Sequence, residues 1–195
     1  MKSSQSSYPI DPRRGIGISA IETYAPEWVL PNAWYDSLMA KKFVKHTGIK
    51  ERCISLEDEV EMSLRAINKL RDGLGFDIND CAGLLFVSPS LIPQTIARRY
   101  LSIDSARQEQ PTRLAWELCH QLDAEPRQVL GINGFCSGYA KALQLVHRKM
   151  QPQVGLGANE FIIVVTASRI SRITDFGCRQ SGALFGDFAT ATLVN

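Results

Sequence analysis

The sequence predicts an α/β fold with a mostly parallel sheet. Residues 82–88 and 161–167 form two almost continuous apolar runs, which are typical of parallel strands covered on both faces. Residues 57–74 and 111–122 instead carry apolar side chains at helical spacing. A third signal lies at residues 128–150, where a β-branched strand, a glycine-flanked cysteine and an amphipathic helix follow one another. Strands that alternate with helices in this way favour a parallel sheet.

The first quarter of the chain predicts a leader, a strand and a helix. Residues 1–14 are polar, contain two prolines and are expected to form a mobile leader. Small and β-branched residues at 15–21 predict the first strand. Residues 24–32 are a turn-rich link, and Asn32 is a suitable cap for a helix over residues 33–45. Residues 49–52 are expected to be a polar surface segment.

The helix over residues 57–74 has acidic residues in its first turn, basic residues in its last turn and one apolar stripe. The apolar spacing within residues 89–110 allows a helix, but a polar break follows it. The next helix, at 111–122, begins with a proline, whose missing N–H is harmless at that position. After the strand at 161–167, a glycine turn runs into a last strand within residues 184–194, which can pair antiparallel with the strand before it.

Composition bounds the possible functions. A chain of 195 residues suits one domain, and its net charge of +2 gives no reason to expect nucleic-acid or membrane binding. No apolar run approaches a membrane span, and the N-terminus lacks the apolar core of a signal peptide, so we expect a cytoplasmic protein. The five cysteines form an odd set with no CxxC pair, which argues against disulfides and against a zinc site. We therefore expect no metal.

Cys136 is the candidate nucleophile. It lies between Gly134 and Gly138, after a strand and before a helix, which is the cysteine version of the Gly-x-Ser-x-Gly nucleophile elbow. The first turn of a helix has unpaired N–H groups and a positive dipole end, both of which favour the nucleophilic thiolate. The alternative is that Cys136 packs as an inert small hydrophobe, as many buried cysteines do.

Four motifs occur in order: Y-x-P-E-x-V-L-x-N at residues 24–32, T-G-I-K-E-R at 47–52, the elbow at Cys136, and L-F-G-D-x-A-x-A at 184–191. Together they resemble the N-terminal half of the β-ketoacyl-acyl-carrier-protein synthase III family of the thiolase superfamily. The resemblance covers residues 15–195 and implies a thiolase-like half-domain of order βαβαβαββ, with a buried helix that carries the cysteine. The C-terminal half would be absent.

The resemblance also implies a chemistry and a set of site residues. Cys136 would accept an acyl group from coenzyme A or from an acyl carrier protein, and its own N–H would stabilise the oxyanion, with no permanently bound cofactor. Arg52 would be a structural ion-pair residue, and residues 94–110 look like an insertion that forms a partner-facing loop. The substrate-binding positions would be Phe135, Ser137, Gly138, Phe188, Lys42 and His46.

Several positions depart from the family pattern. Lys42 and His46 replace a tryptophan and an arginine that line the coenzyme A entrance, which favours a carrier-protein donor. Phe188 and Thr190 replace glycines and are expected either to fill space near the core or to narrow the acyl pocket. Family enzymes carry a catalytic histidine and asparagine in the C-terminal half. His147 cannot replace that histidine, because eleven residues of helix put it ~16 Å from Cys136, and His120 is expected to be a surface or core residue.

The sequence supports three functional hypotheses. The first is a subunit of a split ketosynthase or acyltransferase, completed by a second polypeptide that carries the C-terminal half; the chain could also dimerise through this half, or be a fragment of a longer one. The second is a non-catalytic partner subunit in which Cys136 is a relic. The third, a cysteine α/β-hydrolase fragment, is disfavoured because the one histidine after Cys136 lies on the same predicted helix.

Overall fold

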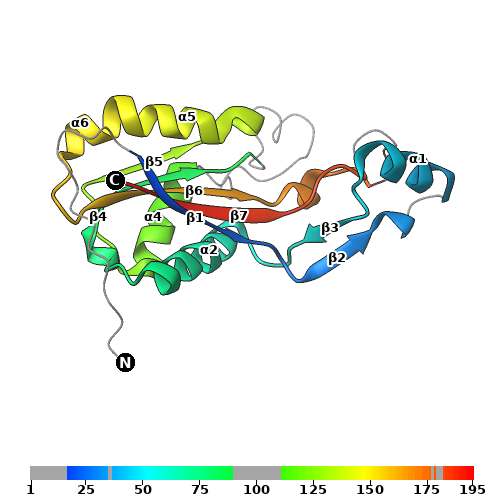
Figure 1. Ribbon diagram of the computed structural model, residues 1–195, viewed down its shortest axis with the longest axis horizontal. Coiled ribbons are helices and arrows are strands. Elements are labelled where there is room, and N and C mark those ends of the chain that lie inside the picture. Colours follow the sequence, from blue (N-terminus) through cyan, green and yellow to red (C-terminus); the bar gives the residue numbers. More distant parts are fainter. Residues whose placement is uncertain (1–16, 35–36, 90–110, 177, 179–181) are drawn as a thin grey trace.

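The computed structural model describes residues 17–34, 37–89, 111–176, 178 and 182–195 (Figure 1). The predicted leader and the predicted insertion at 94–110 lie outside these residues. A five-stranded sheet has the order β1-β7-β6-β4-β5. Its strands are β1 (Ile18–Tyr24), β4 (Cys81–Val87), β5 (Gln128–Ile132), β6 (Phe161–Ser168) and β7 (Phe188–Val194).

The sheet is mixed but mostly parallel, as predicted. Strand β4 pairs in parallel with both β5 and β6. Strand β7 runs antiparallel between β6 and β1, so it is the strand that reverses direction. The expected antiparallel pairing of the last strand with the strand before it is therefore confirmed, and the mixed α/β fold with it.

Helices cover both faces of this sheet (Figure 1). The larger core packs one face against α2 (Glu59–Leu74) and α4 (Pro111–Leu122), and the smaller core packs the other face against the α5 layer. That layer runs from α5 (Gly138–Leu145) through a π-helical turn (Val146–Met150) into α6 (Gln151–Val154). Strands β4 and β6 have almost every side chain buried, as their apolar runs predicted.

Local signals explain the boundaries of α2. The Asp58 carboxylate accepts hydrogen bonds from the N–H groups of Val60 and Glu61, and the Glu61 side chain accepts one from the Asp58 N–H. This is a capping box. Gly75 ends the helix in the left-handed region, at a φ of 69° that glycine adopts without strain. The helix therefore begins two residues later than the predicted residue 57 and ends at the predicted residue 74.

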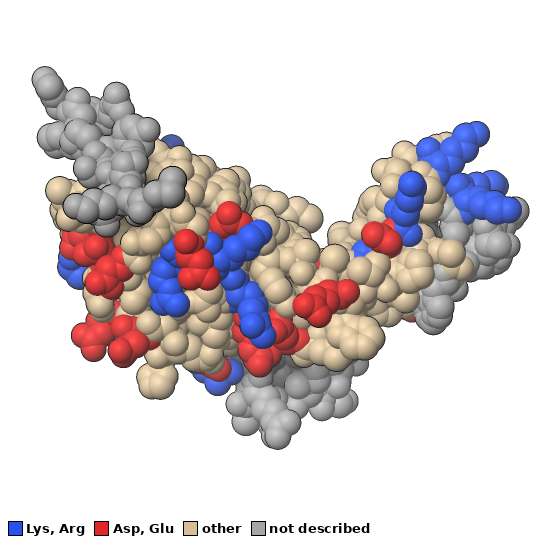
Figure 2. Space-filling model, turned by 60° about the horizontal axis from the view of Figure 1, so that its bottom comes forward, with Lys and Arg blue, Asp and Glu red and all other residues tan. Residues whose placement is uncertain are grey.

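An arm of residues 28–34 and 37–54 extends from the body (Figures 1 and 2). It consists of the antiparallel pair β2 (Trp28–Pro31) and β3 (Glu51–Ile54), a short 3-10 turn (Asn32–Trp34) and α1 (Ser37–Thr47). The sequence expectations here were partly wrong. Residues 28–31 are a strand rather than a link. Lys50 and Glu51 are exposed, as expected of a surface segment, but Glu51 begins a strand and Arg52 is buried. Helix α1 begins at Ser37, four residues later than expected.

The root of the arm is fixed to the loop that precedes β7. Arg52 is buried, and its guanidinium donates a 2.9 Å hydrogen bond to the Gly182 carbonyl. The buried Asp187 carboxylate accepts hydrogen bonds from the N–H of Ser55 (2.8 Å), the N–H of Ser171 (2.9 Å) and the Ser171 hydroxyl (2.5 Å). Two of the sequence motifs, T-G-I-K-E-R and L-F-G-D, thus meet at one structural junction.

Candidate active site

Cys136 lies on a tight turn between β5 and α5. The turn is a short 3-10 helix (Phe135–Ser137), and α5 begins directly after it at Gly138. The N–H and the hydroxyl of Ser137 donate to the Gly134 carbonyl at 3.2 and 3.1 Å, and the Gly138 N–H donates to the Phe135 carbonyl. The cysteine therefore precedes the α-helix rather than lying in its first turn, and its side chain is exposed.

Close packing explains both flanking glycines. A Cβ at Gly134 would lie 2.3 Å from the Cα of Gly138, which no side chain can occupy. A Cβ at Gly138 would lie 2.6 Å from a methyl group of Val87, on β4. The Gly-x-Cys-x-Gly pattern is thus a steric requirement of a turn that presses the start of α5 against the sheet.

Phe135 has an unusual backbone. Its φ is 46°, in the left-handed region that bulky side chains seldom adopt. Conformations of this kind persist where the surrounding structure imposes them, and they concentrate at functional sites. The turn therefore holds Cys136 through a backbone arrangement that its neighbours impose.

A cavity of about 580 Å³ opens beside Cys136. A volume of this size falls in the range of small-molecule sites, which are mostly apolar with a few polar groups. Four large apolar side chains on its wall remain 39–59% exposed: Ile21, Phe135, Phe185 and Phe188. The other lining residues are Pro89, Tyr139, Thr166, Ser168, Ile170, Gly186, Thr190 and Thr192.

Strand β7 supplies one wall of the cavity through alternate residues. Phe188, Thr190 and Thr192 face the α5 layer, whereas Ala189 and Ala191 pack in the core on the opposite face. The hydroxyl groups of Tyr139 and Thr192 lie 3.1 Å apart and share a hydrogen bond. The side chains at 188 and 190, where the family pattern has glycine, therefore do line this cavity.

The structure brings together only some of the predicted site residues. Phe135 and Phe188 line the cavity with Cys136. Ser137 and Gly138 are neighbours in the chain but are not among the lining residues. Lys42 and His46 lie on α1 in the arm, where both are exposed, and they do not line the cavity either.

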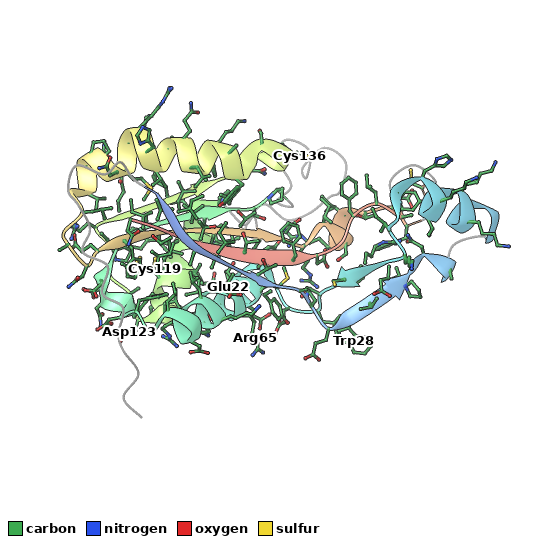
Figure 3. The ribbon with its side chains drawn as sticks, in the orientation of Figure 1. Glu22, Trp28, Arg65, Cys119, Asp123 and Cys136 are labelled. Carbon is green, nitrogen blue, oxygen red and sulfur yellow. The ribbon has the colours of Figure 1, made fainter. Side chains whose placement is uncertain are left out.

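None of the three histidines lines the cavity. His147 is exposed on the π-helical turn that continues α5, and His46 is on the arm. His120 is exposed on α4, and α4 covers the opposite face of the sheet from the elbow. Figure 3 shows this separation, with Cys119 of α4 below the sheet and Cys136 above it. None of the three histidines of this chain therefore supplies a general base or an enolate-stabilising group at this cavity.

The other cysteines have different surroundings. Cys81 and Cys119 are buried, and burial raises the pKa of their thiols to about 12 and about 11 respectively. Cys53 and Cys178 are half-buried, so Cys136 is the exposed thiol among the five. Within the described ranges, no group of three or more His, Cys, Asp or Glu side chains has a metal-binding arrangement.

A second cavity, of about 290 Å³, lies at the base of the arm on the α2 side. Tyr24, Trp28, Glu57 and Arg65 are among its lining residues, and Trp28 and Arg65 are labelled in Figure 3. A hydrogen bond to the Glu57 carboxylate raises the pKa of Tyr24 to about 12, and Arg65 pairs with the same carboxylate at 3.1 Å. Glu57 therefore links Tyr24 and Arg65 at this cavity. Among the described residues, no helix is long and apolar enough to cross a membrane.

Sequence comparison connects this site to known proteins. A family model described as 3-oxoacyl-[acyl-carrier-protein] synthase III matches residues 130–195, a segment that includes the elbow and β7. A β-ketoacyl-[acyl-carrier-protein] synthase III of Staphylococcus epidermidis is 28% identical over 91% of this chain and 50% of its own length. The corresponding enzyme of Geobacillus kaustophilus is 27% identical over 92% of this chain and 53% of its own.

Solved structures show the same fold. A 3-oxoacyl-(acyl-carrier-protein) synthase from Burkholderia xenovorans superposes with a TM-score of 0.73 at 24% identity, over 93% of this chain and 48% of that one. The priming β-ketosynthase of the R1128 polyketide pathway superposes with a TM-score of 0.68 at 19% identity, over 96% and 52%. The predicted resemblance and the thiolase-like fold are confirmed. The chain spans about half the length of the relatives that it matches.

Proposed function

Because this chain resembles β-ketoacyl-[acyl-carrier-protein] synthase III over nearly all of its length, we propose that it is one subunit of a split enzyme of that kind. In this proposal Cys136 takes an acyl group from coenzyme A or from an acyl carrier protein. The subunit then transfers that group, or condenses it with an extender, in fatty-acid or polyketide biosynthesis in the cytoplasm. It needs no bound cofactor, since the acyl thioester is itself the substrate.

One observation carries the proposal: Cys136 is an exposed thiol at the mouth of an apolar cavity large enough for an acyl chain. Its sulfur attacks the carbonyl carbon of the donor thioester, and a new thioester forms on Cys136 as the donor C–S bond breaks. The donor leaves as a thiol with the proton that Cys136 gave up. The hydrogen bonds of the turn use the N–H groups of Ser137 and Gly138, so the Cys136 N–H can serve the oxyanion.

The surroundings of the cavity support a second polypeptide. Several large apolar side chains around Cys136 are partly exposed, among them Phe135 at 59% and Phe188 at 41%. Contiguous exposed apolar surface of this kind marks an interaction site. A partner with the C-terminal half would cover this surface and would bring the histidine and asparagine that the resemblance requires for condensation. Pairing of two copies through this half is a further part of the proposal.

A second candidate function rests on the missing base. Because no histidine lines the cavity, the chain would also suit a structural role in which a partner performs the chemistry. In that case Cys136 would be dispensable, and Cys136→Ala would leave the activity of the assembled complex unchanged.

An assay of acyl transfer to the Cys136 thiol distinguishes the two proposed functions. The chain, purified from its own source, is exposed briefly to acyl-coenzyme A or acyl carrier protein and weighed by native mass spectrometry. The proposal expects a complex with a second polypeptide and one added acyl mass, absent in Cys136→Ala and retained in Cys53→Ala, which removes a half-buried thiol. A complex that never gains the acyl mass would favour the structural role.

A further inference from the structure

The cavity beside the candidate nucleophile has a polar wall on the sheet. Strands β6 and β7 place four hydroxyl side chains on the face that lines it: Thr166, Ser168, Thr190 and Thr192. Helix α5 adds the hydroxyl of Tyr139 from the other side. Covering hydroxyl groups with a plain alkyl chain removes water from them and offers no hydrogen bond in return, which costs free energy. This wall therefore suits a ligand with a polar group of its own.

The protein satisfies these hydroxyl groups only in part. The Thr166 Oγ1 atom is buried and has no hydrogen-bond partner. Tyr139 and Thr192 share one hydrogen bond, with Oη and Oγ1 3.1 Å apart, and within the described ranges their hydroxyl groups make no other. The pair therefore retains hydrogen-bonding capacity that the described residues do not use.

The burial of the two partners indicates which hydroxyl keeps a free proton. Two hydroxyl groups carry two protons, and the bond between them uses one. Thr192 is fully buried, so its proton would lack an acceptor unless it donates to Tyr139, at a cost of about 1–3 kcal/mol. Tyr139 is half-buried and lines the cavity. The favoured arrangement has Thr192 donating to Tyr139, which leaves the Tyr139 O–H to donate into the cavity.

This donor is offset from the reacting thiol. Tyr139 lies three residues after Cys136, which corresponds to about 4.5 Å along a helix axis, and both residues line the same cavity. In the proposed reaction the Cys136 N–H serves the thioester oxyanion. The Tyr139 hydroxyl would therefore meet an oxygen further along the acyl chain.

We propose that the cavity is specific for an acyl group that carries an oxygen substituent, hydroxyl or oxo, and that the Tyr139 hydroxyl, oriented by Thr192, recognises this oxygen. This specificity rests on the proposed function and names its substrate class. The apolar side chains of Phe135 and Phe188 would cover the hydrocarbon part of the same acyl group. A plain alkyl chain would leave the Tyr139 donor unpaired, and a site of that kind discriminates against it.

Removal of single hydroxyl groups tests this recognition. Tyr139→Phe removes the donor and keeps the ring, and Thr192→Val removes the group that orients it. The matched control is Tyr24→Phe, whose hydroxyl bonds Glu57 at the second cavity, on the α2 side of the sheet. Each chain is produced in its source organism, so that any partner stays bound. Acylation of Cys136 by butyryl, 3-hydroxybutyryl and 3-oxobutyryl pantetheine thioesters is then followed by mass spectrometry.

The readout is the rate with each oxygen-bearing group divided by the rate with butyryl. Comparison of this ratio between variants cancels the intrinsic reactivity of the thioesters. For the hydroxyl or the oxo group we expect Tyr139→Phe to lower the ratio about fivefold, the effect of one neutral hydrogen bond, and to accept butyryl at the wild-type rate. Thr192→Val should lower the ratio by less, and Tyr24→Phe should leave it unchanged. A ratio that is the same in wild type and Tyr139→Phe for both groups would overturn the inference.

Binding measurements separate this specificity from the proposed function. The same thioesters are titrated by calorimetry into Cys136→Ala, with and without Tyr139→Phe. If no thioester acylates Cys136 but an oxygen-bearing group binds about fivefold tighter than butyryl only when Tyr139 is present, the recognition stands and the proposed function fails. Acylation without a preference that depends on Tyr139 would overturn the recognition and leave the proposed function intact. Neither acylation nor such a preference in binding would overturn both.

Discussion

The Asp187 junction provides the sharpest stability test of the fold around the site. Asp187 is 2% exposed, and its two carboxylate oxygens accept hydrogen bonds from two backbone N–H groups and one hydroxyl. In Asp187→Asn an NH2 group replaces one oxygen and faces a backbone N–H of Ser55 or Ser171. A buried donor and the new amide then lack partners, at about 1–3 kcal/mol each, so we expect a loss of about 3 kcal/mol.

Thermal unfolding measures this loss. For a chain of this size about 3 kcal/mol lowers the Tm by roughly 6–12 °C. Asp72→Asn is the matched control, because Asp72 is exposed on α2, and it should leave the Tm almost unchanged. Because the junction also fixes the arm to the cavity loop, proteolysis of the arm should accelerate in Asp187→Asn alone. A shift no larger than that of the control would refute the assignment of Asp187 as the fixed point of the arm.

Three further predictions concern the elbow, the thiols and pH. Gly134→Ala should destabilise the protein by about 3 kcal/mol in urea unfolding, because the added methyl would lie 2.3 Å from backbone. Iodoacetamide should alkylate the exposed Cys136 well before Cys81, whose burial raises its pKa to about 12. Hydrogen bonds from Arg127 lower the pKa of Glu160 to about 2, below its unfolded value, so this pair stabilises the protein above about pH 4.5. The Tm advantage of wild type over Glu160→Gln should therefore disappear as the pH falls from about 4.5 toward 2.

Each of these predictions has a control within the chain. Gly73→Ala adds the same methyl at an exposed position of α2 with open space around it, and it should be neutral or stabilising. If Gly134→Ala behaves like Gly73→Ala, the steric account of the elbow is wrong. Peptide mapping should find the first alkylated cysteine at position 136; labelling of Cys119 first would contradict the burial described above. A Glu160→Gln difference that persists at pH 2 would rule out the ion pair as its source.

Local signals were sufficient for the body of the fold. The apolar runs of β4 and β6 identified strands buried on both faces, because burial on both faces needs nothing beyond a continuous apolar sequence. The requirement for glycine at position 134 was equally readable, since a Cβ there would clash with Gly138, four residues along the chain. Each of these features is determined by residues that lie close together in the sequence.

The arm was misread because its structure depends on distant residues. Strand β2 is mostly exposed and includes a proline, so its four residues carry no strand pattern of their own. Arg52 is buried because its partner Gly182 lies 130 residues away in the chain, and a sequence window cannot contain that contact. The cavity lining shows the same limit, because Tyr139 and Thr192 meet from elements 53 residues apart.

Mass analysis of the acyl-enzyme tests the central claim most directly. The full chain is mixed with an acyl carrier protein or acyl-coenzyme A, digested, and searched for a peptide that carries the acyl group. We predict one acyl mass on the peptide that contains Cys136, and none in Cys136→Ala. Acylation at another cysteine with Cys136 unmodified, or no acylation in the presence of the bound partner, would contradict the claim that Cys136 is the acyl acceptor.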